Sequence, residues 1–386
     1  MKNYMPFFLP FWLIFSIGLF FTACSEKQST SGSQEGSEKT EKQKKSKKSQ
    51  KEDQSQKSKS SGVDFEVLVI GETPRIQDRN LMQETLEAFF ENDYPALPQK
   101  EKWFRPTYVH HEDFGNMHQR HKNILIISAG NTDFNTNKII KKIKDDASGL
   151  HILNDVWARP QKVVLVRGDD LSDVADLLDQ NTGRILSAFD RNESRSIRSK
   201  IYNVGSNDKA NKKIKALHGI DIKIPKNFQV LEQVDQEEIP PALREMGILN
   251  FSWIKTETKK SGQHLLIFQQ EYNNELQLAA DNIMNLRDSI GKYYGDGPNP
   301  DSYFQIERQY EPDFKLIESE EPYSLFINGL WRMEGDFMGG PFKQKAALHS
   351  TKDKITYIDA FVYAPGTSKK RFIKRMEVVI GTAKIP

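Results

Sequence analysis

Short apolar runs separated by polar turns recur through the first half of the chain. FEVLVI (65–70), NILIIS (123–128) and KVVLVRG (162–168) each hold four consecutive aliphatic residues, a pattern typical of strands buried on both faces. Helical spacing of apolar residues predicts helices over about 80–92 and near 138–144. The first half is therefore expected to alternate strands with helices.

A longer helix is expected after the third strand. The segment DDLSDVADLL (169–178) opens with acidic side chains, which suit the positive end of a helix dipole. Apolar residues then recur with helical spacing at Val174, Leu177, Leu178, Ile185, Leu186 and Phe189.

The second half favours antiparallel strands. LNFSWIKTE (249–257) and HLLIFQQEY (264–272) are separated by SGQ and predict a hairpin. Apolar residues recur at alternating spacings of three and four over 275–293, which makes this segment the clearest predicted helix of the chain. Two further long strands and a closing amphipathic segment are expected at 324–334, 354–365 and 368–380.

These elements predict an α+β fold with two mixed lobes, residues 63–210 and 211–386, joined near 207–218. Each half contains strands, a helix, more strands and a terminal helix. This shared order also suggests a weak internal duplication, although element order is not sequence identity.

The N-terminal residues belong to neither lobe. Lys2 precedes an apolar run from Pro6 to Phe21, which is the layout of a secretory signal peptide over residues 1–23. Cys24 follows two small residues, and FTAC resembles the lipobox of bacterial lipoproteins, whose cysteine is acylated. Several acyl chains hold a protein stably on a bilayer, at about 0.8 kcal/mol per buried methylene. We therefore predict a membrane partner reached through a lipid anchor on Cys24, with no spanning segment.

Residues 24–62 are predicted to form a disordered tether. After the cysteine, the segment contains only Ser, Lys, Gln, Glu, Gly, Thr and one Asp, so nothing offsets the entropy of ordering it. A flexible coil of this length would span roughly 35 Å. The lysine run KQKKSKK (42–48) is either a solvated spacer or a contact with anionic lipid or cell-wall polymer.

Charge and cysteine content exclude several classes of function. Subtracting the lysine excess of the tether and Lys2 from the formal net charge of +2 leaves about −3 for residues 63–386. Phosphate recognition requires a concentrated basic face, so we expect no nucleic-acid partner. Cys24 is the only cysteine, and its acylation leaves no thiol for a disulfide, a metal site or a nucleophile.

Half of the eight histidines lie in HHEDFGNMHQRH (110–121). Neighbouring strand residues point to opposite faces, so only one of His110 and His111 can join His118 and His121 in a metal site. The spacing lacks the helical arrangement of HExxH, and the polar neighbours favour a solvated surface cluster. No metal site is predicted.

Other motifs disclose no reaction. The chain has no GxSxG, Walker or GxGxxG sequence, and SxxK matches such as those at 252–255 and 289–292 lack the companion motifs of penicillin-binding enzymes. The loop YYGDGPNPDSYF brings Asp296, Asn299 and Asp301 together, yet it departs from the order of an EF-hand. A helix-terminating loop explains it better than a calcium site. No cofactor is expected.

The most unusual stretch is GLWRMEGDFMGGPF (329–342). Its glycines permit positive φ or close backbone approach, and its aromatic side chains could line a groove. A β-bulge or tight turn under a core aromatic is the alternative. If the stretch lines a groove, the ligand-binding residues are Trp331, Arg332, Glu334, Asp336, Phe337, Met338, Gly339, Gly340 and Phe342.

Five segments stand out in combination: PALPQKEKWF (95–104), RHKNILII (120–127), WARPQKVVLV (157–166), MGGPF (338–342) and FVYAP (361–365). Together they resemble a family of Bacteroidota lipoproteins catalogued only as a domain of unknown function. The resemblance covers most of residues 65–380 and implies an envelope lipoprotein with an α+β body. It brings no activity, cofactor or catalytic residue, and HHEDFGNMHQRH has no counterpart in it.

The sequence thus predicts a cell-envelope lipoprotein, and the residues after Cys24 favour the periplasmic face of the outer membrane. The leading functional hypothesis is non-catalytic binding of an envelope protein or of a cell-wall or glycan ligand. The alternative is a hydrolase of envelope glycan or peptidoglycan. That enzyme would use Glu334 and Asp336 with Arg332, because two residues spaced by two on a regular strand share a face.

Overall fold

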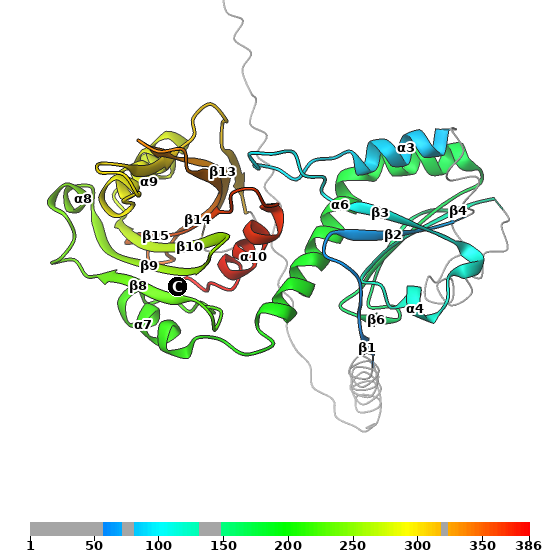
Figure 1. Cartoon of the computed structure of the whole chain (residues 1–386), viewed down its shortest axis with the longest axis horizontal. Coiled ribbons are helices and arrows are strands. Elements are labelled where there is room, and N and C mark those ends of the chain that lie inside the picture. The colour runs from blue at the N-terminus through cyan, green and yellow to red at the C-terminus, as the bar shows by residue number, and fades with distance from the viewer. Residues whose placement is uncertain (1–56, 72–80, 131–147, 318–322) are drawn as a thin grey trace, which may run out of the picture. The chain divides into compact units, whose positions relative to one another are not determined.

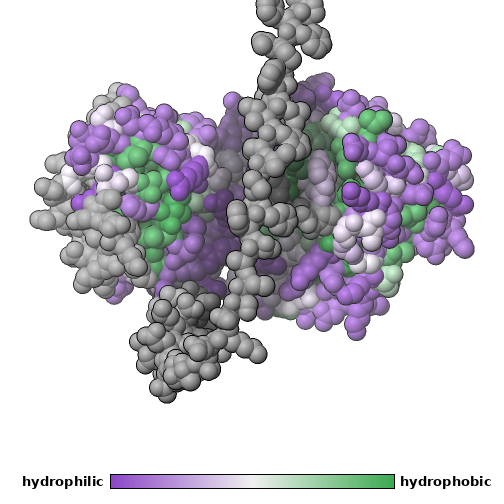
Figure 2. All heavy atoms as spheres, turned by 180° about the vertical axis from the view of Figure 1, so that it is seen from behind, coloured by the Kyte–Doolittle hydropathy of each residue, from purple (hydrophilic) through white to green (hydrophobic). Residues whose placement is uncertain are grey.

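The computed structural model describes residues 57–71, 81–130, 148–317 and 323–386 (Figure 1). Two sheets organise this part of the chain, one of five strands and one of eight. Both lobes mix helices with strands, which confirms the α+β fold class. Figure 2 shows hydrophilic residues over most of one face, with hydrophobic residues gathered in narrower bands. No helix within the described ranges is both long and apolar enough to cross a membrane.

The first sheet has the strand order β3-β2-β4-β7-β5. Its strands are β3 (Arg105–His110), β2 (Glu66–Gly71), β4 (Asn123–Ala129), β7 (Lys162–Gly168) and β5 (Gly149–Asn154). Four are mutually parallel, and β5 runs antiparallel to β7. The three apolar runs form β2, β4 and β7 at the centre, where both faces are buried as predicted.

Two helices, α3 (Leu81–Phe90) and α6 (Leu171–Ile201), pack on one face of this sheet. Both were expected from the apolar spacing. The side chain of Asp170 caps α6 by accepting hydrogen bonds from the backbone of Ser172 and Asp173. The helix expected near 138–144 lies outside the described residues.

The second half of α6 is held by polar contacts. The Glu193 side chain, which is fully buried, accepts hydrogen bonds from the backbone N–H of Phe65, the Asn123 amide and the Lys122 ammonium at 2.8–3.1 Å. The apolar periodicity ends at Phe189 because the buried face of the helix turns polar there. The helix predicted from that periodicity is consequently too short.

Residues 57–62, which composition assigns to the tether, belong to the folded part. The short elements of the first lobe are β1 (Ser58–Lys59), β6 (Ala158–Arg159), η1 (His111–Asp113) and α4 (Asn116–Gln119). β1 pairs in parallel with β6, and the backbone N–H of Lys122 donates to the Ser61 carbonyl at 3.0 Å. These are backbone hydrogen bonds, which need no apolar side chain, so composition placed the end of the tether too late.

The second sheet has the strand order β11-β13-β14-β15-β10-β9-β8, and β12 also pairs with β13. Its strands are β8 (Gln229–Val234), β9 (Ile248–Thr258), β10 (Ser261–Glu271), β11 (Tyr303–Ile306), β12 (Asp313–Leu316), β13 (Ser324–Glu334), β14 (Gly339–Leu348) and β15 (Lys354–Tyr363). All the pairings are antiparallel. The two lobes therefore differ in topology, and the suggested internal duplication is wrong.

The predicted strands of the second half are confirmed as β9, β10, β13 and β15. The β9–β10 hairpin turns at Lys259 and Lys260, and SGQ already belongs to β10, so the turn lies earlier than expected. β14 was not predicted, because Lys343, Gln344 and Lys345 interrupt its apolar pattern although all three are buried.

Helices cover both faces of the second sheet. α7 (Asp208–His218) and α10 (Lys370–Ile380) pack on one face, and α8 (Pro241–Glu245) and α9 (Ala280–Tyr294) on the other. The helix expected over 275–293 is interrupted, because η2 (Glu275–Leu278) is followed by an extended Ala279. The region predicted to join the lobes forms α7. α10 reaches back to the first lobe, where Lys374 contacts Asp190 of α6.

Candidate functional site

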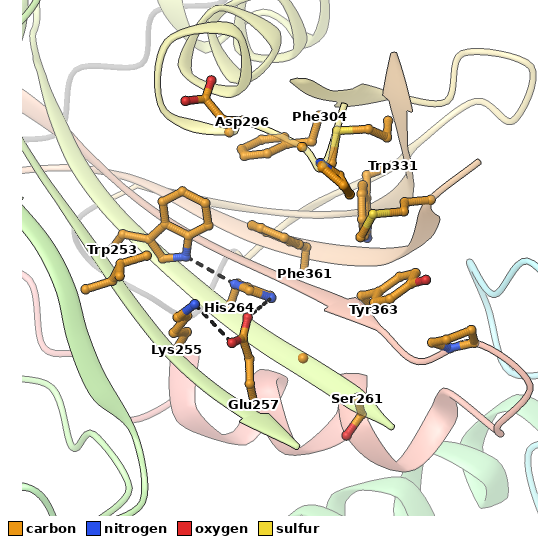
Figure 3. Close-up of a pocket in the computed structure, with 18 of the residues that line it drawn as sticks. Trp253, Lys255, Glu257, Ser261, His264, Asp296, Phe304, Trp331, Phe361 and Tyr363 are labelled. Atoms are coloured by element: carbon orange, nitrogen blue, oxygen red, sulfur yellow. Dashed lines mark hydrogen bonds and ion pairs between the residues drawn. The ribbon is translucent and has the colours of Figure 1, made fainter. Parts of the chain in front are cut away.

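One end of the second sheet carries a pocket of about 560 Å³ (Figure 3). Side chains of β9, β10, β13 and β15 line it from the sheet, and the loop after α9 lines another side. These segments are distant in sequence, and they meet because β15 pairs with both β10 and β14 in the sheet.

Six aromatic rings line the pocket: Trp253, Tyr294, Phe304, Trp331, Phe361 and Tyr363. The ring centroid of Phe361 lies 5.3 Å from that of Trp331 and 4.9 Å from that of Phe304. These three rings are almost fully buried, so they belong to the core. The other three rings are half-buried and are free to present a surface to a ligand.

His264 fixes the orientation of the Trp253 indole. Its Nδ1 accepts a hydrogen bond from Trp253 Nε1 at 3.2 Å, and its ring stacks on Phe361 at 4.6 Å between centroids. Burial lowers the pKa of His264 to about 4. The imidazole is therefore neutral at neutral pH and carries its proton on Nε2, which lies 3.8 Å from Glu257 Oε1. Its role is to position the indole.

Charged groups stand at the edge of the aromatic wall. Lys255 Nζ lies 3.0 Å from Glu257 Oε2 on β9. Figure 3 shows this pair on one side of the rings and Asp296 on the other. The pocket thus combines an apolar floor with both signs of charge at its margin.

Two glycines let the end of α9 approach β11 closely enough to close the pocket. A Cβ at Gly291 would lie 2.0 Å from the Phe304 carbonyl oxygen, and a Cβ at Gly295 would lie 2.1 Å from the Phe304 ring. The following loop contains Asn299, whose amide donates to the Gly335 carbonyl at 3.0 Å. The loop considered for calcium therefore ends the helix, ties to a neighbouring hairpin and lines the pocket.

The glycine- and aromatic-rich stretch 329–342 forms the end of β13, a turn and the start of β14. Of its nine candidate ligand-binding residues, the structure brings Trp331 and Met338 to the pocket. Phe342 is fully buried beneath the guanidinium of Arg287, and Phe337 is fully exposed at the turn.

The expected pairing of Glu334 with Asp336 on one strand face is wrong. β13 ends at Glu334, and Gly335 adopts a φ of 78° that breaks the strand. Glu334 instead pairs with Arg332 at 2.7 Å, while the Asp336 carboxylate accepts from the backbone N–H of Phe337. The sequence could not reveal the end of the strand, because glycine also occurs within strands.

The glycines of this stretch serve close backbone packing. A Cβ at Gly339 would lie 2.8 Å from the Trp331 carbonyl oxygen, and one at Gly340 would lie 2.0 Å from the Val362 carbonyl oxygen. The same carbonyl of Val362 accepts a hydrogen bond from Trp331 Nε1 at 3.1 Å. Gly340 therefore lets β14 lie close enough to β15 for this bond to form.

Replacing Gly340 with alanine is expected to destabilise the protein by about 1–3 kcal/mol, because the strands must separate to admit the methyl group. Gly183→Ala in α6 is the matched control. A Cβ there meets nothing within 4 Å, so this change should raise stability by about 0.5–1 kcal/mol. Guanidinium unfolding midpoints measure both, and equal midpoints for the two variants would refute the packing role.

The four histidines of 110–121 are not gathered into one site. His110 and His111 lie against each other, with ring centroids 4.4 Å apart, and His118 Nδ1 bonds to the Asp113 carbonyl. His121 is buried between the Asn123 carbonyl and the Glu66 carboxylate. Within the described ranges, no group of three or more His, Cys, Asp or Glu is arranged to hold a metal ion.

Sequence reasoning missed most of the pocket. Trp253, His264 and Tyr363 come from three different strands, and each lies in a segment that was assigned to a strand on periodicity alone. The one usable signal was FVYAP, whose alternation sends Phe361 and Tyr363 to the same face. Their meeting with Trp253 depends on the strand order.

The fold and the pocket define an α+β protein with an aromatic pocket at one end of an antiparallel sheet. Residues 207–382 match a family described as Domain of unknown function (DUF4837), and residues 60–202 match a second, Domain of unknown function (DUF8532). The matches follow the two lobes and support the resemblance to proteins of unassigned function. No curated protein matches the chain.

A solved structure of cyanobacterial PsbP (CyanoP) from Synechocystis sp. PCC 6803 is similar to part of the chain. The sequences are 10% identical, and the match covers 44% of this chain and 87% of that one, with a TM-score of 0.29. A likeness this distant supports no argument about the fold or the function.

Proposed function

We propose that the protein is a non-catalytic binding domain of a cell-envelope lipoprotein and that its aromatic pocket holds a saccharide unit of an envelope glycan. One observation carries the proposal: a pocket of about 560 Å³ combines half-buried aromatic rings with charged groups at its edge. The lipid anchor on Cys24, which lies outside the described residues, would hold the domain near such polymers. We place it on the periplasmic side of the outer membrane.

The chemistry of a saccharide suits these groups. Each sugar ring has an apolar C–H face, which packs on an aromatic ring, and hydroxyl groups at its rim, which bond to charged side chains. The pocket volume falls within the range of about 300–1,000 Å³ that is usual for small-molecule sites. Trp253 and Tyr363 supply ring surface, while Lys255, Glu257 and Asp296 supply hydrogen-bonding groups.

Two polar side chains of the pocket support a binding role over nucleophilic catalysis. His264 is held neutral, with Nδ1 committed to Trp253. Ser261 is buried, its hydroxyl lies 3.1 Å from that of Thr258, and among the described residues no histidine forms a hydrogen bond with it. A serine nucleophile requires a neighbouring general base, which this contact does not provide.

A hydrolase is the second candidate function, because two carboxylates, Glu257 and Asp296, both line the pocket. Glycosidases use two carboxyl groups on opposite sides of the scissile bond. Figure 3 places these two residues on opposite sides of the aromatic rings. Glu257 is paired with Lys255, which favours a binding role for it.

The test is a titration of the full chain, purified in detergent, with soluble muropeptides and envelope oligosaccharides. Binding should appear as a saturable change in tryptophan fluorescence. The affinity measured by calorimetry should fall by about tenfold or more in Trp253→Phe and in Tyr363→Ala. Tyr310→Ala is the control, since Tyr310 is 61% exposed and lies outside the pocket.

Binding that is unchanged in both pocket variants, or absent for every glycan tested, would contradict the proposal. Release of smaller products, lost in Glu257→Gln or Asp296→Asn, would establish the hydrolase instead. Trp253→Phe keeps an aromatic ring, so a folded variant with weakened binding separates ligand contact from stability.

A further inference from the structure

A second hollow lies between α6 and the second sheet, away from the aromatic pocket. Its volume is about 1,030 Å³. The wall is one face of α6, which carries Arg191, Arg195 and Arg198. The floor is a face of the sheet, where Lys315 of β12 lies opposite Phe326 of β13. We call this hollow the arginine groove.

Part of the positive charge of the arginine groove has no ion pair among the described residues, although Asp190, Asp313 and Glu377 also line the groove. Arg195 pairs with Asp155 at 2.7 Å, and the other basic side chain of the groove, Lys343, is bound to Glu377. No described carboxylate lies within 4 Å of the charged nitrogens of Arg191, Arg198 or Lys315. Within the described residues, these three cations of the groove therefore form no ion pair.

The groove also exposes a sheet edge. Among the described strands, β12 pairs only with β13. The backbone N–H of Ile317 donates to the Ser324 carbonyl. Hydrogen-bonded pairs alternate along an antiparallel ladder. The backbone N–H and C=O groups of Lys315 and Asp313 therefore also point toward β13, while those of Phe314 and Leu316 point away from it. Those outward groups can accept another strand.

Apolar surface accompanies the charge. Leu316 is 44% exposed at the strand edge, and Phe326 is half-buried on the floor. A ligand that fills the groove therefore meets backbone hydrogen-bonding groups, apolar side chains and unpaired cations together. Polypeptides offer a matching row of alternating N–H and C=O groups, whereas lipid headgroups and glycans do not.

We infer that the arginine groove binds an extended acidic peptide segment of a partner protein. The peptide adds a strand to the free edge of β12 and sets its carboxylates against Arg191, Arg198 and Lys315. Guanidinium groups bind carboxylates through paired hydrogen bonds, which gives the arginines a direct role in selecting acidic partners. The inference is independent of the aromatic pocket, because the two sites share no lining residue.

The test uses the full chain in detergent and a synthetic octapeptide of alternating glutamate and valine. Calorimetry should show binding that weakens as salt rises from about 50 to 500 mM, because the attraction is between charges. Arg191→Gln/Arg198→Gln should weaken binding at least about tenfold, and a peptide with glutamine in place of glutamate should behave likewise. Arg184→Gln is the matched control, since Arg184 is exposed on the same helix outside the groove.

A peptide with alternate amides N-methylated tests the strand pairing. It keeps every carboxylate but lacks the donors that a sheet edge requires, so its binding should be lost. Equal binding by the methylated peptide, by the glutamine peptide or by the double variant would overturn the inference. Capture of phosphatidylglycerol vesicles that needs the same arginines, without peptide binding, would assign them to a lipid surface instead.

Discussion

Replacing Arg287 with methionine is expected to destabilise the second lobe by about 3–5 kcal/mol, since it leaves a buried carboxylate without its partner. Arg287 Nε on α9 lies 2.6 Å from Asp359 Oδ2 on β15, and both side chains are fully buried. The guanidinium carbon also lies 3.9 Å from the centroid of the Phe342 ring. The planar charge is thus held between a carboxylate and an aromatic face.

The loss should depend on the unpaired charge more than on the missing side chain. Arg287→Met/Asp359→Leu should recover much of the stability, because replacing both partners of a buried pair by apolar groups is often neutral. Arg287→Lys should not recover it, since an ammonium cannot reproduce the planar contact with Phe342.

Unfolding in guanidinium chloride measures the free energy of unfolding of each variant, with Arg308→Met as the control. Arg308 pairs with Asp288 on the same helix as Arg287, but its side chain is 46% exposed, and such pairs are worth less than about 1 kcal/mol. Equal losses for Arg287→Met and Arg308→Met would show that the buried pair has no special weight.

Glu377→Gln is expected to be the second most damaging change, at about 3–5 kcal/mol, because it removes one of the two carboxylates that neutralise the fully buried Lys374. Lys374 Nζ lies 2.6 Å from Glu377 Oε1 and 2.5 Å from Asp190 Oδ2 of α6. Glu377 also binds Lys343 of β14 and accepts from the Tyr94 hydroxyl at 3.3 Å. One carboxylate of α10 thereby links both lobes.

The stability of the wild-type protein should fall at acid pH through this residue. Burial alone would raise the pKa of Glu377, but the ammonium groups of Lys343 and Lys374 outweigh it and lower the pKa from 4.5 to about 2. A lowered pKa contributes stability that is complete above pH 4.5 and is lost as the pH falls through 2. The contribution is roughly 3 kcal/mol.

Thermal unfolding between pH 7 and pH 3 measures this dependence. At pH 7 the Glu377→Gln variant should unfold at a lower temperature than the wild type. Its unfolding temperature should then fall less on acidification, because the variant has no carboxylate at this position to protonate. Glu112→Gln should follow the wild type, since the Glu112 side chain is 78% exposed. Parallel curves for wild type and Glu377→Gln would remove Glu377 as the source of the acid sensitivity.

The elements that could be predicted are those whose signal is local. The central strands β2, β4 and β7 were visible as apolar runs, and the start of α6 was visible as an acidic cap followed by helical spacing. Prediction failed where the buried side chains are polar or charged. Lys345 in β14 and Glu193 in α6 are buried, and their sequence neighbourhoods resemble a solvated surface.

The candidate site shows the same division. A turn was one of the two alternatives for the stretch 329–342, and the structure has one between β13 and β14. Trp331, singled out in the same stretch, lines the pocket. Glu334 and Asp336 were expected to cooperate and do not, because the chain turns between them. The lipid anchor at Cys24 stays a prediction, since it lies outside the described residues.

The sequence by itself determined the α+β class, the central strands and the main helices, because each follows from the spacing of apolar residues within one segment. Only the tertiary structure decided which strands pair and in which direction, and hence that Trp253, Trp331, Phe361 and Tyr363 line one pocket. The physical reason is that strand partners are chosen by packing and hydrogen bonds between distant segments. Local spacing carries no record of those contacts.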